Sequence, residues 1–189
     1  MAYVRIPETD EKFAEQSEIS KYLASVGIDY GVWDREYDVA EGASDEDILG
    51  AYKTEIETLK AEGGYVTADI INVVPETPGL DAMLEKFKRE HWHDEDEVRF
   101  VIDGEGVFHI NPGEGKPVVA IEVSAGDFIR VPEGTLHWFE LCSSKKIKCI
   151  RLFQDPAGWA PHYTDSEKEK SFLEVCLGPS FIPQGRVQL

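Results

Sequence analysis

The spacing of apolar side chains along residues 1–90 predicts mainly helices, each with one face turned toward a core. Helices are expected over residues 18–26, 45–63 and 79–90, where apolar residues recur every three or four positions. Residues 65–74 are rich in β-branched side chains and predict a strand. The residues expected to cap the helix N-termini, because their hydroxyls can accept from free backbone N–H groups, are Ser17, Ser44 and Thr77.

From residue 97 onward the pattern changes to short runs rich in Val, Ile and Phe. These runs are VRFVI, VFHI, VVAIEV, FIRV, LHWFEL and IKCIRLF, separated by Gly, Pro, Asn and Asp. A hairpin turn is expected at residues 103–106 (DGEG). Such spacing favours an antiparallel sandwich or barrel over alternating strands and helices. We therefore expect a mainly β protein with a jelly-roll barrel and several peripheral α-helices, mostly from the N-terminal third.

The net charge and the hydropathy of the chain argue against nucleic acids and membranes as partners. Thirty-seven acidic and nineteen basic residues give a net charge of −18 at pH 7, which repels phosphate backbones and anionic lipid heads. The longest aliphatic run, residues 70–74, is far shorter than the ~20 residues that span a bilayer, and the polar start does not resemble a signal peptide. We expect a cytoplasmic monomer that binds neither nucleic acid nor membranes.

The cysteines point to no metal or disulfide framework. Cys142, Cys149 and Cys176 are odd in number and show no CxxC spacing. We therefore expect reduced, mostly buried thiols.

Candidate chemistry begins at His91, in the stretch HWHDEDEVRFVIDG. If His91, His93 and Glu97 lie in one extended segment, all three point to the same side. Alternatively, the polar residues 94–96 form a turn that brings Glu97 back to the histidines. His137, which follows a tight turn at residues 132–134, is the expected fourth ligand from a neighbouring strand.

Three neutral imidazoles and one carboxylate form a mixed nitrogen and oxygen ligand set. With no thiolate, this set suits Fe(II), Ni(II), Mn(II) or Zn(II). A six-coordinate ion would keep two positions open, which suits a substrate that binds through two adjacent oxygens and supports dioxygen chemistry.

These residues resemble the two cupin motifs, HxH(x)3E(x)6G from His91 to Gly104 and G(x)5PxG(x)2H from Gly126 to His137. The chain departs from the general pattern at Glu85, where glycine is usual, and at Leu141, where asparagine is frequent. Neither residue is a ligand. Nearly the whole chain is similar to the acireductone dioxygenase family, through HWHDEDEVRF, PEGTLHWF and IRLF.

The resemblance implies one Fe(II) or Ni(II) ion per chain, held by His91, His93, Glu97 and His137. It implies oxidative cleavage of 1,2-dihydroxy-3-keto-5-methylthiopentene with O2 in methionine salvage. The iron form would release 4-methylthio-2-oxobutanoate and formate, and the nickel form 3-methylthiopropanoate, formate and carbon monoxide. It also implies a single cupin domain over residues 1–189, with helical cover and first strands (1–90), a metal-binding core barrel (91–153) and a C-terminal tail (154–189).

Two arginines fit an anionic enediolate substrate. Arg99 follows Glu97 by two positions and is expected beside the metal, and Arg151 interrupts the otherwise apolar face of IKCIRLF. We expect both to act in catalysis and substrate binding; the alternative for each is a structural ion pair with Glu97 or another carboxylate. Phe139 shares the parity of His137 and is expected to line the pocket for the methylthio tail.

Other histidines and one tryptophan have simpler interpretations. His109 and His162 are expected to be surface or hydrogen-bonded residues, and Trp159 either closes over the site or packs on the barrel. Two rival functions stay open: another cupin oxygenase or a sugar-phosphate isomerase, and a non-catalytic cupin that binds a small molecule.

Overall fold

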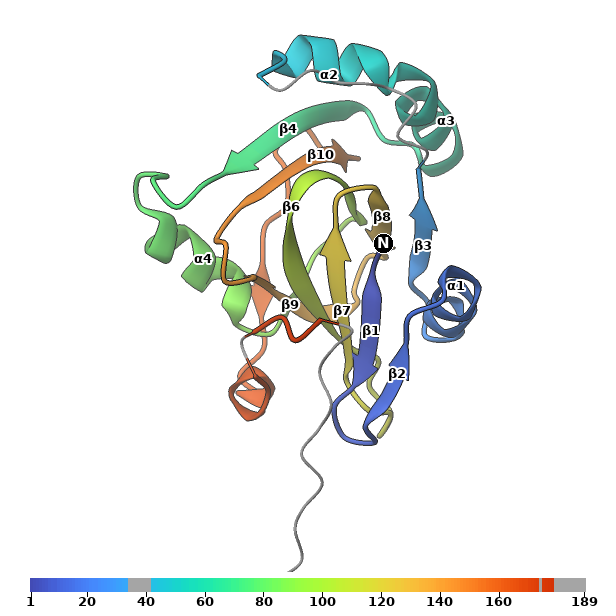
Figure 1. The fold of residues 1–189 in the computed structure, drawn as a ribbon, viewed down its shortest axis with the longest axis vertical. Helices are drawn as coiled ribbons and strands as arrows, with labels where there is room; N and C mark the ends of the chain where they lie inside the picture. The colour runs from blue at the N-terminus through green and yellow to red at the C-terminus, as the bar shows by residue number, and fades with distance from the viewer. Residues whose placement is uncertain (34–41, 174, 179–189) are drawn as a thin grey trace, which may run out of the picture.

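One long strand, β6 (Glu97–Asn111), belongs to both layers of the molecule (Figure 1). The first half of β6 pairs with β8 (Asp127–Val131) and β10 (Ile147–Phe153). Its second half pairs with β7 (Val119–Ser124) and β9 (Leu136–Leu141). The computed structural model describes residues 1–33, 42–173 and 175–178.

Shorter strands extend both layers at their edges. In the first layer the order is β11-β5-β9-β6-β7-β1-β2, and in the second β3 pairs with β8 and β4 pairs with β10. The strand pairings among the described residues are antiparallel, which confirms the expected mainly β architecture. The bounds of these edge strands are β1 (Tyr3–Ile6), β2 (Glu11–Phe13), β3 (Asp29–Val32), β4 (Thr67–Val73), β5 (His91–Trp92) and β11 (His162–Tyr163).

The predicted hairpin turn at residues 103–106 is wrong, because β6 continues through it. Gly104 has φ +79°, and a Cβ on it would lie 2.1 Å from the carbonyl oxygen of Lys146. A bulge opposite β10 shifts the register here. Val101 therefore faces the interior before the bulge and Phe108 faces it afterwards, although the two positions differ in parity.

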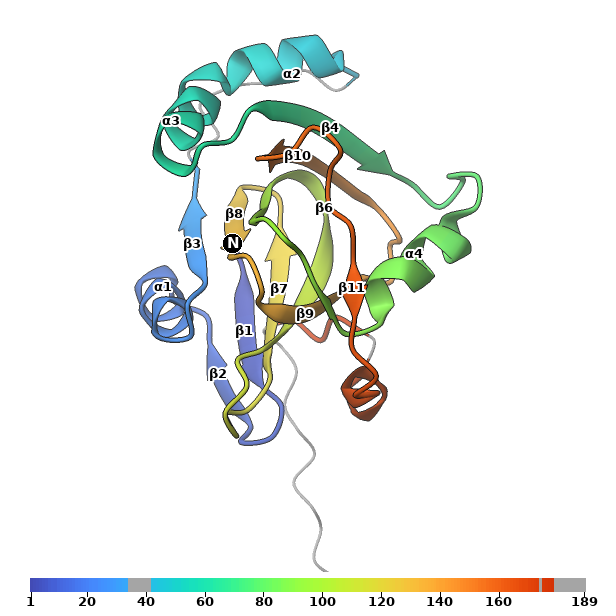
Figure 2. The same ribbon diagram turned by 180° about the vertical axis from the view of Figure 1, so that it is seen from behind.

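The helices lie at the periphery, as expected. Both views show α2 and α3 over β4, α1 beside β3, and α4 beside β9 (Figures 1 and 2). The helices are α1 (Gln16–Ser25), α2 (Asp45–Ala51), α3 (Lys53–Gly63) and α4 (Leu80–Lys88), and the short 3-10 helix is η1 (Lys168–Ser171).

The helix expected over residues 45–63 is confirmed at its start and interrupted at its centre. Ser44 caps α2 by accepting from the backbone N–H of Asp47, and the Asp47 side chain returns the contact. Tyr52, with ψ 19°, separates α2 from α3. Gly50, a weak helix former, precedes the break, and the buried ring of Tyr52 packs 4.8 Å from that of Phe100.

The other two expected caps are wrong. Ser17 lies inside α1, whose N-cap residue is Glu15. Thr77 lies before α4, whose N-cap is Gly79. The Thr77 hydroxyl instead accepts from the backbone N–H of Val74 at 3.0 Å, so it closes a turn rather than a helix end.

Two apolar cores hold the layers together. The first fills the space between the sheets and extends under α1 and α4, with buried residues such as Ile6, Val101, Phe108, Ile121 and Cys149. The second lies between α2, α3 and the outer face of β6, β8 and β10, with residues such as Ile48, Ile56, Phe100, Phe128 and Leu152.

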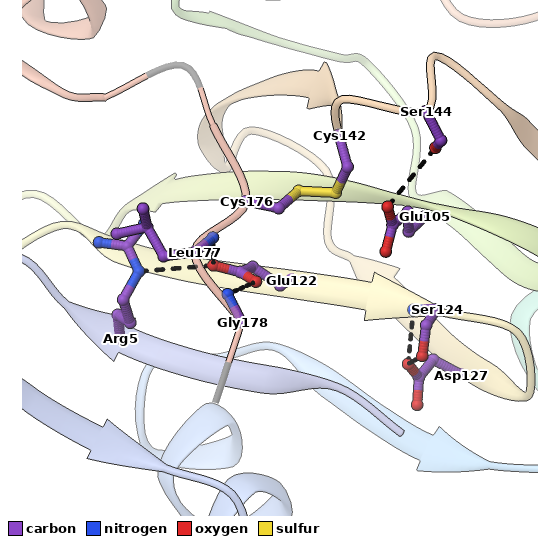
Figure 3. The surroundings of a disulfide bond; sticks show 10 residues. All are labelled: Arg5, Glu105, Glu122, Ser124, Asp127, Cys142, Ser144, Cys176, Leu177 and Gly178. Atoms are coloured by element: carbon purple, nitrogen blue, oxygen red, sulfur yellow. Dashed lines mark hydrogen bonds and ion pairs between the residues drawn. A yellow bond between two sulfur atoms is a disulfide. The ribbon is translucent and has the colours of Figure 1, made fainter. Parts of the chain in front are cut away.

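The prediction of reduced cysteines is wrong for two of the three. Cys142 and Cys176 form a disulfide, with Cα atoms 5.2 Å apart (Figure 3). Their sequence separation of 34 residues carries no recognisable spacing, so only the fold brings them together. Cys149 is free and buried, as expected.

Within the described residues, no helix is long and apolar enough to cross a membrane.

Candidate metal centre

Three histidines and one glutamate meet at the interior end of β5, β6 and β9. His91, His93, Glu97 and His137 are at most 2% exposed, and their ligand atoms lie within 4.8 Å of one another. The chain bends at residues 94–95 before β6 begins. Of the two interpretations of this stretch, the one in which a turn returns Glu97 to the histidines is therefore correct.

The Nδ1 atom of each histidine lies within hydrogen-bond distance of a backbone carbonyl oxygen, which orients the ring. Because a carbonyl oxygen only accepts, we place the ring proton on Nδ1, which leaves Nε2 as a lone-pair donor. Metal-ligating histidines are typically held in this way. The histidines, their carbonyl partners and the distances are His91 with Arg89 (2.7 Å), His93 with Ala160 (3.0 Å) and His137 with Thr135 (2.8 Å).

The carboxylate of Glu97 faces these lone pairs. Its Oε2 atom is 3.1 Å from Nε2 of His93 and 3.1 Å from Nε2 of His137. The Nε2 atom of His91 is buried and has no hydrogen-bond partner among the described residues. Lone pairs and a carboxylate oxygen repel each other at such distances unless a positive charge lies between them. The cluster therefore fits a divalent cation with nitrogen and oxygen ligands.

Charges around Glu97 keep its carboxylate ionised. Complete burial raises the pKa of a carboxyl group, but the adjacent guanidinium of Arg99 outweighs it, so the pKa of Glu97 lies well below 4.5. Burial and the neighbouring His137 lower the pKa of His91 to about 4. The cluster thus offers an anionic carboxylate and a neutral His91 imidazole at neutral pH, which are the ionisation states that ligate metals.

Arg99 is fixed beside the cluster, at the position that sequence analysis expected. It is 4% exposed, and its Nε donates to Oε1 of Glu97 at 2.6 Å. Its Cζ atom lies 5.3 Å from the ring centroid of Phe139 and 5.1 Å from that of Trp159. The ion pair with Glu97 matches the structural alternative considered for this residue.

Arg151 lies on β10, where it is opposite Arg99 of β6 on one side and opposite Asp69 of β4 on the other. Its Nε and Nη2 atoms donate to the two oxygens of Asp69 at 2.8 and 2.7 Å. This bidentate pair balances one of two neighbouring guanidinium charges, as Glu97 balances the other. The side chain of Arg151 is 23% exposed, so it lies nearer to solvent than Arg99.

The segment that carries Trp159 packs against the cluster, a contact that sequence analysis left undecided. The indole ring lies 6.1 Å from that of His93, and its N–H donates to the carbonyl of Asp96 at 3.2 Å. The Cζ atom of Arg151 is 5.6 Å from the same indole. Ala160, which orients His93, carries no signal in the sequence because its contact is made by the backbone.

The structure places the three other residues considered from the sequence, Phe139, His162 and His109, in different surroundings. Phe139 is 5% exposed and packs 4.8 Å from Phe108 in the interior core, on the same side of β9 as His137. His162 stacks on Trp92 and pairs with Asp94, outside the cluster. The expectation for His109 is wrong: it is 1% exposed, and neither ring nitrogen has a hydrogen-bond partner among the described residues.

Comparisons with known proteins agree with this geometry. The model of the ARD/ARD' family matches residues 5–161. An acireductone dioxygenase of Sulfurihydrogenibium sp. (strain YO3AOP1) is 44% identical over 159 residues, which cover 79% of this chain and 87% of that protein. One of Aquifex aeolicus (strain VF5) is 37% identical over 179 residues, or 93% of this chain and 97% of that protein. The solved structure of acireductone dioxygenase from Bacillus anthracis, with cadmium in its active centre, has a TM-score of 0.77 at 33% identity and covers 86% of this chain and 98% of that one. The chain therefore belongs to the ARD/ARD' family, the acireductone dioxygenases.

Proposed function

We propose that this chain is an acireductone dioxygenase in which His91, His93, Glu97 and His137 hold one Fe(II) or Ni(II) ion. The observation that carries the proposal is the convergence of three oriented Nε2 atoms on one buried carboxylate. When bound, the ion supplies a Lewis acid with positions open to two substrate oxygens. The substrate would be 1,2-dihydroxy-3-keto-5-methylthiopentene, which presents two such oxygens on adjacent carbons.

In this proposal Arg99 stabilises the negative charge of the enediolate. Its Nε is occupied by Glu97, so the other guanidinium N–H groups are the ones available to substrate oxygens. The contact with Glu97 also keeps the guanidinium from rotating away, which lowers the cost of ordering it when the substrate arrives. Burial strengthens the interaction, because charges attract more strongly where water is excluded.

Arg151 and Phe139 complete the proposed substrate site. Asp69 holds Arg151 at both Nε and Nη2, so Arg151 contributes a fixed positive charge on the solvent side of Arg99. Phe139, packed under the Arg99 guanidinium, offers an apolar wall for the methylthio tail.

The overall reaction adds both atoms of dioxygen to the cleaved products. Cleavage between the first two substrate carbons gives formate and 4-methylthio-2-oxobutanoate. Loss of a further carbon as carbon monoxide gives formate and 3-methylthiopropanoate. The first outcome is expected with iron and the second with nickel, so product analysis reports which ion the protein uses.

The test combines metal analysis with product analysis. Protein purified without chelators is assayed for metal content, oxygen consumption and carbon monoxide release with acireductone. We expect about one ion per chain and turnover that stops when the ion is removed. His93→Ala should lose both the ion and the activity, whereas His162→Ala, which changes an exposed histidine outside the cluster, should keep both. Turnover by metal-stripped protein, or interconversion of a sugar phosphate without oxygen uptake, would contradict the proposal.

A further inference from the structure

A cavity of ≈ 580 Å³ lies on the outer face of the β1–β7–β6–β9 layer. The hairpin of β1 and β2 forms one side of it, and residues 168–173 together with Leu177 form the other. The cavity is lined by Arg5, His109, Lys168, Phe172, Leu173 and Leu177, among others, and by none of the four residues of the metal cluster. We call it the outer pocket. Its volume is in the range of small-molecule sites.

Strand register sets the polar floor of the outer pocket. Arg5 lies opposite Ala120, Ala120 opposite His109, and His109 opposite Trp138. Arg5 and His109 are thus two strands apart, about 10 Å between their backbones, and only a methyl group stands between them. The small Ala120 side chain thus has the residue that carries a guanidinium on one side and the residue that carries an imidazole on the other.

The two polar residues of this floor, Arg5 and His109, are buried, and four of their nitrogen atoms lack a hydrogen-bond partner among the described residues. Arg5 is 6% exposed and His109 is 1% exposed. Among the described residues, Nε and Nη2 of Arg5 and both ring nitrogens of His109 have no partner. A buried donor or acceptor that lacks a partner destabilises the folded protein, because it has lost its hydrogen bonds to water. Four such atoms around one cavity are unusual in a folded protein, and they indicate a ligand that supplies the missing partners.

The ion pair of Arg5 with the nearest acid, Glu122, is longer than a hydrogen bond of good geometry. Glu122 lies 3.5 Å from Nε of Arg5, but its two oxygens accept from the backbone N–H groups of Leu177 and Gly178, each at 2.7 Å (Figure 3). Arg151 shows the contrast, because its Nε and Nη2 atoms each hold one oxygen of Asp69. On Arg5, by contrast, Nε has only the long contact with Glu122, and Nη2 has no hydrogen-bond partner among the described residues.

Apolar and aromatic side chains form the other wall. The ring of Phe172 lies 6.1 Å from that of His109 and 5.5 Å from that of Trp138. Leu173 and Leu177 follow it along the same wall. His109 stacks on Trp138 at 5.0 Å with an interplanar angle of 7°, which fixes the plane of the imidazole. One end of the outer pocket is therefore polar and the other is apolar.

We propose that the outer pocket binds a small organic monocarboxylate with an apolar tail. The carboxylate accepts from the guanidinium of Arg5, whose Nη2 lacks a partner among the described residues. The N–H of His109 offers a further donor, and the tail packs on Phe172, Leu173 and Leu177. This site is separate from the metal centre, and the proposal does not depend on the reaction catalysed there.

The charges of the lining select a singly charged ligand. Burial and the nearby charge of Arg5 lower the pKa of His109 to about 3, so its ring is neutral at neutral pH and adds no second cation. Two lysines, Lys12 and Lys168, and three carboxylates, those of Glu8, Asp10 and Glu11, also line the pocket, so its cationic and anionic groups are equal in number. The three carboxylates offset the three cations, so the lining lacks the excess positive charge that would favour a doubly charged phosphate over a carboxylate.

The test is calorimetric titration of metal-loaded protein with 4-methylpentanoate. We expect one site with a Kd on the order of 1 mM or tighter, as suits a ligand of this size. Three further probes separate the parts of the proposal. 4-Methylpentanamide lacks the charge, acetate lacks the tail, and inorganic phosphate carries a different anion; each should bind at least about tenfold more weakly. Absence of binding by 4-methylpentanoate, or tighter binding of phosphate, would overturn the proposal.

Substitutions at residues of the outer pocket and elsewhere test where 4-methylpentanoate binds. Arg5→Met should weaken binding of 4-methylpentanoate at least about tenfold, while the matched control Arg130→Met, which removes an arginine paired with Asp29 elsewhere, should leave it unchanged. His109→Phe keeps an aromatic ring on Trp138 and should also weaken binding, which keeps the test decisive if Arg5→Met does not fold. His93→Ala should retain binding. Equal affinity in Arg5→Met and His109→Phe, or loss of binding in His93→Ala, would assign the probe to another site.

Discussion

His91 and His137 lie directly opposite each other on β5 and β9, with their ring centroids 4.5 Å apart. Because side chains alternate along a strand, a shift of one residue in this pairing would turn one imidazole away from the other. The register between these strands is therefore a condition for the metal site. Glu97 reaches the same point from β6, so three chain segments must be placed correctly before the ligand set is complete.

We expect Glu97→Gln to lose the metal and to destabilise the protein. The amide cannot replace the anionic ligand, and it leaves the guanidinium of Arg99 buried without its carboxylate partner. Breaking one side of a buried ion pair costs about 3–5 kcal/mol. Metal content and urea unfolding of the metal-free proteins measure the two effects. The exposed Glu133→Gln serves as control and should change neither; retained metal in Glu97→Gln would contradict the ligand assignment.

The role of Arg151 can be tested by comparing the KM and the free energy of unfolding of variants at Arg151 and at Asp69. If Arg151 binds the substrate, Arg151→Lys should raise KM by about tenfold, equivalent to about 1.4 kcal/mol. Asp69→Asn removes the same ion pair but leaves the guanidinium, so it should raise KM much less. Equal effects of the two variants on KM and on the free energy of unfolding would show that Arg151 acts only through its pair with Asp69.

Acid sensitivity should depend on His109. Its pKa of about 3 in the folded protein lies below the value of 6.5 expected in the unfolded chain. The unfolded state therefore binds the proton first, so stability that is complete above pH 6.5 falls as the pH drops toward 3. At about pH 5 this loss amounts to about 2 kcal/mol.

His109→Phe should remove this part of the acid sensitivity. Urea unfolding at about pH 8 and about pH 5 should show a difference between the two pH values that is about 2 kcal/mol smaller in His109→Phe than in the unsubstituted protein. His162→Phe is the control, because His162 lies on the surface beside Asp94. The same pH dependence in His109→Phe and the unsubstituted protein would show that His109 is accessible to protons in the folded state.

The disulfide should contribute measurably to stability. Cys142 and Cys176 tie the C-terminal segment to the end of β9, beside the contacts of Leu177 and Gly178 with Glu122 (Figure 3). Closing a loop of this length is expected to add about 2–4 kcal/mol. The double variant Cys142→Ser/Cys176→Ser should lose that amount in urea unfolding.

Reduction provides the matched experiment for the disulfide. Dithiothreitol should lower the unfolding free energy of the unsubstituted protein to that of the double variant and leave the double variant unchanged. A protein whose stability does not respond to dithiothreitol would show that the two thiols are not joined in solution.

Several features that are set by neighbouring residues could be predicted from the sequence. The strands LHWFEL and IKCIRLF coincide with β9 and β10, because alternation and turn residues mark their ends. Ser44 and Asp47 form a complete cap within four residues. The spacing of His91, His93 and Glu97 likewise lies within one short stretch, so the candidate ligands could be named before any fold was known.

Other features depend on contacts between distant segments, and the sequence alone did not reveal them. β6 crosses Gly104 without turning because β10 passes against it, and the resulting bulge places His109 on the outer face although its parity matches Arg99. The disulfide joins residues 34 positions apart. Only the fold brings Arg5 to within two strands of His109.

The sequence by itself thus determined the mainly β architecture, the peripheral helices and the residues of the metal cluster, because these follow from short-range periodicity and spacing. The tertiary structure decided which partner each arginine has, which cysteines are joined and where the outer pocket lies. The physical reason is that these relationships are set by strand register and by packing between segments far apart in the chain. A one-residue change in register reverses the face of every side chain on a strand.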